Sequence, residues 1–492
     1  MSLAAHYPAL QVVVPLLAAP LCVIVKRGTF CWWLALVVSI TTLFFAGMLL
    51  SQTLEQGVIS YAIGGWAAPW GIEYRVDALD AFVLVIVATI GSIVMLYAQK
   101  SVRAEIDKEK HYLFYAAYLL CLTGLLGITI TGDAFNLFVF LEISSLSTYA
   151  LVSMGRDRRA LTAAYQYLIM GTLGATFYLI GVGLLYMVTG TLNMADLAER
   201  LPALFDSRTV RAALAFLTVG ISLKLALFPL HLWLPNVYTY APSVVTAFLA
   251  GTATKVAVYV LIRVIFTIFG VEFALGTMPL DVILLPLACA AIIIASLVAI
   301  FQEDVKRMLA YSSVAQIGYI VVGIALASAT GLVASLIHLF NHALMKGALF
   351  LSLGCVVYRV GTVRIGDIAG LGRQMPWTMG AFVVGGLSLI GVPLTVGFVS
   401  KWYLVLAAIE QGWWPVVVVV LVGSLLALIY VWRVVECAYF RPAGERIVSE
   451  APASLLLTTW LLIGANLYFG VDTALTVGVA ESAAHQLLGI QP

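Results

Sequence analysis

The segment GLVASLIHLFNHALMKGALFLSLGCVVY, residues 331–358, decides the fold. It is longer than the roughly 20 apolar residues that a helix needs to cross a hydrocarbon core. Three basic residues nevertheless lie inside it, at His338, His342 and Lys346. Their spacing places them on one stripe of a helix. The segment therefore predicts a transmembrane helix that carries a row of protonatable side chains.

Similar apolar runs recur along the whole chain. Of its 492 residues, 63% are hydrophobic and only 10% are charged, whereas a soluble protein needs roughly a quarter of its residues charged. The net charge of +2 is too small to predict a nucleic-acid partner. We therefore expect an all-α polytopic membrane protein of about fourteen transmembrane helices, at residues 8–25, 30–50, 76–97, 111–130, 134–152, 162–188, 211–234, 243–269, 280–300, 308–328, 331–358, 378–409, 414–436 and 453–472.

The basic residues predict how the chain is oriented. Lysine and arginine are abundant in the loops after odd-numbered runs, such as Arg156, Arg158 and Arg159, and scarce in the loops after even-numbered runs. Cytoplasmic loops carry the excess of positive charge. We therefore expect odd-numbered loops in the cytoplasm, both termini outside, and a location in the cell (inner) membrane. The first apolar run has no basic residues before it, so we expect a mature span and no cleaved signal peptide.

Four lysines lie well inside apolar runs, at Lys224, Lys255, Lys346 and Lys401. A lysine near the bilayer centre costs about 3 kcal/mol on insertion scales. Their positions in different helices favour a chain of protonatable sites along a hydrated path. The alternative is a set of fixed ion pairs that hold helices together. Arg263, near the end of the eighth run, is expected to reach the membrane interface.

Glu142 is the clearest carboxylate inside a predicted helix, and we expect it to pair with Lys224. A buried pair of this kind is rarely a strong net stabiliser. We therefore predict that it acts as a switch, which lowers the proton affinity of the lysine when it opens. Asp77, Asp80 and Asp133 lie at the starts of helices and are expected to be interface or capping residues.

The row of His338, His342 and Lys346 is interpreted as a proton relay, because histidine titrates near neutral pH. A structural role is the alternative. No carboxylate lies near this row in sequence, and the six cysteines form no CxxC pair. We therefore predict no metal and no cofactor bound by this chain.

Two runs contain helix breakers next to a buried lysine. Proline removes a backbone hydrogen bond, and breaks of this kind in membrane helices are typical of transport sites. Ordinary proline kinks are the alternative. The breaks lie five spans apart, which suggests a five-helix unit used twice, the second copy inverted. The residues concerned are Pro229, Gly391, Pro393 and Gly397, with His231 included among the candidate proton carriers.

This organisation predicts four segments. Residues 1–110 would form an N-terminal three-helix segment, and residues 111–270 the first five-helix repeat. Residues 271–440 would form the second, inverted repeat, and residues 441–492 the C-terminal helix.

The segments quoted above, together with Thr131 to Glu142, Gly251 to Lys255 and Lys306 to Ser313, resemble the antiporter-like subunits of proton-translocating membrane complexes. That family includes the D-type component of the Mrp Na⁺/H⁺ antiporter, membrane-arm subunits of respiratory complex I and subunits of membrane-bound hydrogenases. The resemblance covers nearly the whole chain and is strongest to the Mrp D type.

The resemblance implies fourteen helices with inverted repeats and broken seventh and twelfth helices. It also implies roles for the buried residues. Glu142 with Lys224 would form the gating pair, and Lys255 the central proton site. His338 and Lys346 would link the two half-paths, and Lys401 would be the exit-side site.

The leading functional hypothesis is a proton-conducting subunit of an Mrp-type antiporter, which would exchange Na⁺ or another monovalent cation for protons alongside other hydrophobic subunits. The alternative is a pumping subunit of a redox-driven complex. A structural scaffold is a third hypothesis, against which the four buried lysines argue. The sequence indicates no catalytic centre within the chain, although the complex could be an oxidoreductase.

Overall fold

A computed structural model describes residues 3–443 and 447–490. Most of this part of the chain is helical, and its only strands form one small antiparallel hairpin. The elements are α1 (Tyr7–Val25), α2 (Gly28–Gln56), β1 (Ile59–Ala62), β2 (Glu73–Val76), α3 (Ala78–Glu105), α4 (His111–Ile130), α5 (Ala134–Ser153), α6 (Arg159–Thr189), α7 (Met194–Arg200), α8 (Arg208–Leu225), α9 (Trp233–Tyr240), α10 (Ser243–Gly251), α11 (Ala253–Ile262), α12 (Leu280–Ala290), α13 (Ser296–Ile300), α14 (Val305–Ala325), α15 (Ala329–Val360), α16 (Leu371–Gln374), α17 (Pro376–Ile390), α18 (Val396–Glu410), α19 (Trp414–Phe440), α20 (Ala453–Val471) and α21 (Ala474–Leu488).

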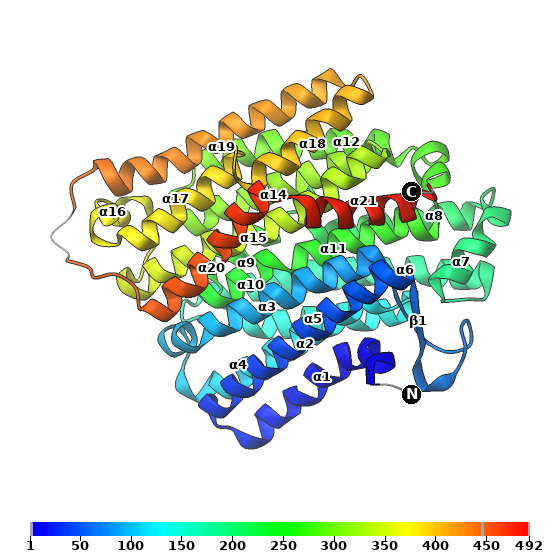
Figure 1. Cartoon of the computed structure of the whole chain (residues 1–492), viewed down its shortest axis with the longest axis horizontal. Helices are drawn as coiled ribbons and strands as arrows, with labels where there is room; N and C mark the ends of the chain where they lie inside the picture. The colour runs from blue at the N-terminus through cyan, green and yellow to red at the C-terminus, as the bar shows by residue number, and fades with distance from the viewer. Residues whose placement is uncertain (1–2, 444–446, 491–492) are drawn as a thin grey trace.

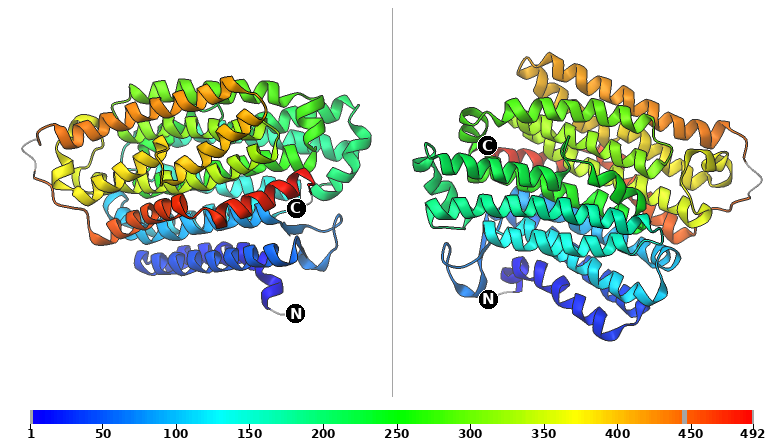
Figure 2. Two further views of the ribbon diagram at one scale, coloured as in Figure 1. Left: turned by 45° about the horizontal axis from the view of Figure 1, so that its top comes forward. Right: turned by 180° about the vertical axis from the view of Figure 1, so that it is seen from behind.

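The long helices run side by side as one bundle (Figure 1). α1 and α2 lie at one edge of the bundle, and α19 lies at the opposite edge in every view (Figure 2). α15 lies in the interior, where it packs against α3, α10, α14, α17, α18 and α20. The row of basic residues that the sequence singled out is therefore carried by a central helix.

Within the described residues, 12 helices are long and apolar enough to cross a membrane. The prediction of a polytopic helical membrane protein is confirmed. The predicted seventh and twelfth spans are absent from the 12 because each is divided in two. Both parts of the twelfth are short, and α8, the longer part of the seventh, has 18 residues of which three are basic. α8 is separated from α9, and α17 is separated from α18.

Both divisions have a local cause. After α8, Ala226 adopts a left-handed conformation with φ 59°, and Pro229 and Pro235 follow. After α17, Gly391 and Leu394 have φ of 95° and 71°, on either side of Pro393. A residue in the left-handed region ends a helix, and proline prevents its continuation. Backbone carbonyls at these ends are left free for other donors.

A third interruption was not predicted. α10 ends at Gly251, Thr252 leaves the helical region with φ −127° and ψ −60°, and α11 begins at Ala253. The same stretch then continues as π-helix over Arg263–Ile268. A lone glycine inside an apolar run is a weak breaking signal, so this division was not visible in the sequence.

The hairpin and the two ends of the described chain lie together. His6 Nδ1 is 3.0 Å from the Tyr61 hydroxyl of β1. At the other end of the chain, the side chain of Gln486, in α21, accepts a hydrogen bond of 3.3 Å from the amide of Ala78, which follows β2. Figure 1 shows the hairpin, α7 and the end of α21 at the same end of the bundle.

Burial in this bundle is reversed relative to a soluble protein. Leu425 of α19 is 62% exposed and Leu461 of α20 is 52% exposed, whereas Lys255 is 1% and Lys346 is 0% exposed. An apolar outer surface is suited to lipid or to other hydrophobic subunits. The polar residues that matter for function therefore lie inside the bundle.

Candidate functional site

Lys224 and Glu142 lie together, as the sequence predicted. Lys224 is in the last turn of α8, immediately before the interruption, and Glu142 is in the middle of α5. The Lys224 Nζ atom is 3.7 Å from Glu142 Oε1 and donates a shorter hydrogen bond, 2.6 Å, to the hydroxyl of Ser145. The ammonium is thus shared between a carboxylate and a hydroxyl on the same face of α5. Ser145 was missed, although its position three residues after Glu142 places it on that face.

A small cavity of about 30 Å³ adjoins Lys224. Ser145 and Tyr167 line it on one side, and Ala253 and Val256 of α11 line it on the other. This volume is enough for a water molecule with polar neighbours. The cavity leads from Lys224 towards α11, where Lys255 lies between the two lining residues in sequence.

Lys255 is held by the unpredicted interruption of its own helix. Its Nζ atom donates to the carbonyl of Ala250, near the end of α10, and lies 3.4 Å from the Thr254 hydroxyl. That end carries the partial negative charge of unpaired carbonyls. No carboxylate forms an ion pair with Lys255 among the described residues. Its charge is therefore stabilised by backbone dipoles and a hydroxyl, without a counter-ion.

The row on α15 is buried and partly hydrogen-bonded. His338 Nε2 is 2.9 Å from Gln316 Oε1, and its Nδ1 is 2.7 Å from the Ser400 hydroxyl. Because the amide oxygen accepts from Nε2, the hydroxyl is free to donate to Nδ1 of the neutral ring. The rings of His338 and His342 lie 6.2 Å apart and nearly parallel.

His342 and Lys346 continue the row. Neither ring nitrogen of His342 has a hydrogen-bond partner in the described part of the chain. Lys346 Nζ donates to the Leu309 carbonyl at 2.8 Å and to the Ser312 hydroxyl. α10, whose last turn accepts the hydrogen bond from Lys255, packs against α15. The structure thus brings Lys255 to the row from a different helix.

Lys401 is held by the end of the broken twelfth span. Its Nζ atom donates to the carbonyls of Leu389 and Ile390 at 3.0 and 2.9 Å, and to the Ser424 hydroxyl at 3.0 Å. It also lies 4.8 Å from the centre of the Tyr319 ring. The carbonyls belong to the last turn of α17, so the break provides acceptors for the lysine.

Gly391 and Gly397 contribute in different ways to this arrangement. Gly391 needs its positive φ to end α17. Gly397 lies so close to α17 that an added Cβ would overlap the Ser388 carbonyl oxygen. Pro229 and Pro393 lie within the interrupted segments themselves.

His231 is the predicted site residue that the structure does not bring into the row. It lies in the segment between α8 and α9, is 7% exposed, and its Nδ1 has no partner within the described residues. Its ring contacts Phe228 and Tyr311. No group of His, Cys, Asp and Glu that could hold a metal ion occurs in the part of the chain that the structure describes.

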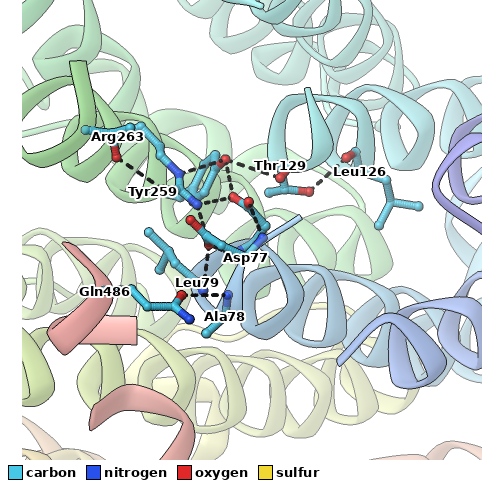
Figure 3. A network of polar contacts seen from close by, with 10 residues as sticks. Asp77, Ala78, Leu79, Leu126, Thr129, Tyr259, Arg263 and Gln486 are labelled. Carbon is cyan, nitrogen blue, oxygen red and sulfur yellow. Dashed lines mark hydrogen bonds and ion pairs between the residues drawn. The ribbon is translucent and has the colours of Figure 1, made fainter. Parts of the chain in front are cut away.

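The sequence indicated no partner for Arg263, and the structure supplies two. Its guanidinium is 2.5 Å from both Asp77 and Asp80, at the start of α3 (Figure 3). The Tyr259 hydroxyl donates to Asp80 at 2.6 Å. Asp77 and Asp80 also form a capping box at the start of α3, as expected for capping carboxylates. The two carboxylates compensate the charge of the buried arginine.

The central part of the chain matches a family of known proteins. Residues 131–427 match the family described as NADH:quinone oxidoreductase/Mrp antiporter, TM. The N-type component of NADH-quinone oxidoreductase from Desulforudis audaxviator is 44% identical over 93% of this chain and 94% of its own. The D-type component of the Na⁺/H⁺ antiporter from Alkalihalophilus pseudofirmus is 30% identical over 83% of this chain and 81% of its own.

Solved structures are similar over nearly the full length. A chain of the Mrp complex from Dietzia sp. has a TM-score of 0.91 and 26% identity, covering 99% of this chain and 98% of that one. A chain of an archaeal membrane-bound sulfane sulfur reductase has a TM-score of 0.90 and 30% identity, covering 98% and 97%. The bundle described above is thus an architecture found in multisubunit membrane complexes.

Proposed function

Because this chain belongs to the NADH:quinone oxidoreductase/Mrp antiporter transmembrane family, we propose that it conducts protons in a multisubunit complex that exchanges a monovalent cation, Na⁺, for H⁺. The observation that carries the proposal is the series of buried protonatable side chains that crosses the interior of the bundle. Such residues are costly in a membrane and mark ion paths by default.

The proposed path has two halves that meet at Lys255. In the first half, the Glu142–Lys224 pair opens, and the proton passes through the small cavity beside Lys224 to Lys255. In the second half, the proton moves along His342 and His338 towards Lys401. The His338 ring lies 6.2 Å from the His342 ring, and its Nδ1 contacts the hydroxyl of Ser400, which directly precedes Lys401; these contacts support this order.

Lys346 is proposed to set the charge at the junction, because it is fully buried and lies on the same stripe of α15 as the histidines. His231 is proposed to act at the interrupted seventh span. The two interruptions would let the helix ends near Lys224 and Lys401 shift without disturbing the rest of the bundle.

We further propose the arrangement that the sequence predicted. The chain would lie in the cell (inner) membrane with both termini outside, and residues 111–270 and 271–440 would be the two inverted repeats. Other hydrophobic subunits would cover part of the exposed apolar surface, and Na⁺ would move through the complex in which this chain works.

A second candidate function has specific support. The 44% identical relative is a component of a quinone reductase, and the sulfane sulfur reductase is a respiratory complex. In a complex of that kind, electron transfer in partner subunits would drive protons through the same residues. The two functions differ in the energy source and share the path.

The test uses everted membrane vesicles that contain the chain with its natural partner subunits. We expect an imposed Na⁺ gradient to drive proton movement, detected by a pH-sensitive dye. Glu142→Gln should abolish that movement while the chain still assembles in the membrane. Glu410→Gln, which changes an exposed carboxylate at the end of α18, is the matched control and should transport normally.

Full transport by Glu142→Gln would reject the proposed path. Proton movement that requires a quinone and a reductant, and does not respond to Na⁺, would favour the second candidate. Mass spectrometry of the purified complex separates the two independently, because iron–sulfur subunits accompany only a redox-driven pump.

A further inference from the structure

Lys401 has more supporting contacts than the other buried lysines. Its hydrogen bonds to two carbonyls of α17 and to the Ser424 hydroxyl match the three donors of an ammonium. No carboxylate forms an ion pair with it among the described residues. Within the same part of the chain, it is the only lysine that lies against an aromatic ring, that of Tyr319. The site is therefore suited to the charged form of the side chain.

Tyr319 contacts both Lys401 and the last histidine of the row. It lies in α14 and is 1% exposed. The centre of its ring is 4.8 Å from the Lys401 Nζ atom and 5.7 Å from the centre of the His338 ring. Gln316, three residues earlier on the same face of α14, binds the other side of the histidine through Nε2. α14 therefore presents Tyr319 at the point where the proposed path passes from α15 to Lys401.

α19 holds the ring of Tyr319 in place. The Tyr319 hydroxyl donates a long hydrogen bond of 3.4 Å to the carbonyl of Val420. A Cβ added at Gly423 would overlap that hydroxyl, so the glycine supplies the space in which it lies. The next residue, Ser424, accepts a hydrogen bond from Lys401. One helix thus positions the ring and also provides one acceptor for the ammonium.

The ring of Tyr319 is suited to hold a cation and not to carry a proton. The face of an aromatic ring has no proton to exchange, but its negative potential favours an ammonium over a neutral amine. The polar contact that leads from His338 to Lys401 is the hydroxyl of Ser400, 2.7 Å from His338 Nδ1. The phenol hydroxyl of Tyr319 is bound to α19 instead. The role of Tyr319 is therefore separate from the transfer itself.

We propose that Tyr319 is a positioning residue that holds the protonated form of Lys401 at the broken end of α17, so that Lys401 stores the last proton of the path before its release. The inference rests on the proposed function and adds the residue that decides how firmly that proton is held. Lys255 and Lys346 each have two acceptors and no aromatic contact among the described residues. They hold a charge less firmly, which favours proton movement towards Lys401.

The first test removes the aromatic ring in vesicles that contain the whole complex. In Tyr319→Leu the initial rate of proton movement should fall by about tenfold, because a buried cation–π contact is lost. Tyr319→Phe keeps the ring and loses only the long hydrogen bond, so its rate should fall only slightly. Tyr115→Leu is the matched control. Tyr115 is 3% exposed and forms no hydrogen bond or cation–π contact among the described residues, so that variant should transport as the parent chain does.

A second measurement separates the charge of the ring from its shape, and covers the case in which Tyr319→Leu does not assemble. Phenylalanine with one, two or three ring fluorines replaces Tyr319, because fluorine weakens the negative face of the ring and changes its size little. Transport should fall with each added fluorine. Lowering the pH by about one unit at the same imposed gradient should restore it, since acid repopulates the ammonium. His338 is the other titratable group near Lys401, and α17 and α19 contribute only carbonyls and a hydroxyl.

Equal rates across the fluorinated series would show that the ring only fills space, and would overturn the inference. A parent rate in Tyr319→Leu would do the same. In either case, loss of transport in Glu142→Gln would leave the proposed function intact, because that variant tests the path and not the hold on Lys401. Normal transport in Glu142→Gln would reject the proposed function and this inference together.

Discussion

The buried arginine and the buried lysines are stabilised in different ways. Arg263 is paired with two carboxylates at 2.5 Å, whereas Lys255 and Lys401 are held by backbone carbonyls at helix ends. An arginine does not release its proton in a protein, but a desolvated lysine does so readily. A carbonyl also stabilises an ammonium without competing for its proton. We infer that Arg263 has a structural role and that the lysines are the carriers.

This difference predicts that Arg263→Gln destabilises the fold. Removing one partner of a buried ion pair costs about 3–5 kcal/mol, because the remaining charges are left uncompensated. The apparent melting temperature of the complex in mild detergent should therefore fall clearly. Arg208→Gln, which changes an exposed arginine at the start of α8, is the control and should melt with the parent. Equal melting of both variants would contradict the structural role of the Asp77–Asp80–Arg263 cluster.

At the residue scale, the sequence predicted the charged members of the site and missed its neutral ones. Lys224 and Glu142 were identifiable because charges are rare within membrane helices. Ser145, Gln316 and Ser400 hydrogen-bond the predicted residues, but serine and glutamine carry no cost that would single them out. The partners of Arg263 were missed because they come from a helix more than 180 residues away in the chain.

At the scale of elements, helix interruptions provide the acceptors for two of the lysines. α10 ends beside Lys255 and α17 ends beside Lys401. The second interruption was predicted because proline and glycine mark it directly. The first was not, because Thr252 and a single glycine have no strong breaking preference and tertiary packing decides their conformation. Gly251 has no room for a Cβ beside Ile90, which is a constraint of packing.

The packing of α17 against α18 leads to a prediction for Gly397→Ala. The added Cβ would overlap the Ser388 carbonyl oxygen, so the two half-helices must move apart. Overpacking of this kind costs about 1–3 kcal/mol. The shift should also pull the carbonyls of α17 away from Lys401 and reduce proton movement. Vesicle transport and detergent melting measure the two effects.

Gly183→Ala is the matched control for this variant. Gly183 lies within α6, and nothing lies within 4 Å of an added Cβ there. Alanine favours a helix over glycine by about 1 kcal/mol, so stability should not fall. A normal transport rate in Gly397→Ala would show that the close approach of α17 and α18 is not needed for function.

At the scale of the whole molecule, hydropathy alone was sufficient to predict a polytopic helical bundle. It could not predict how the helices pack, because every span is apolar and lipid contact and helix contact use the same residues. The central position of α15 and the peripheral position of α19 (Figure 1) therefore came only with the structure.

The orientation of the bundle in the membrane can be tested by labelling residues at its two ends. His6 and Gln486 contact the hairpin region, so the side that holds the hairpin also holds both ends of the described chain. Trp70 lies in the connection between β1 and β2 and is 91% exposed. Arg158 is exposed in the loop after α5, a helix that begins beside the hairpin and therefore ends on the opposite side of the bundle. With the excess of basic residues in the cytoplasm, an impermeant thiol reagent applied to intact cells should label Trp70→Cys and not Arg158→Cys. Opening the membrane should make Arg158→Cys reactive. The parent chain gives the background labelling, because its own cysteines are buried or half-buried. Labelling of Arg158→Cys in intact cells would show that the bundle has the opposite orientation, with both ends of the described chain in the cytoplasm.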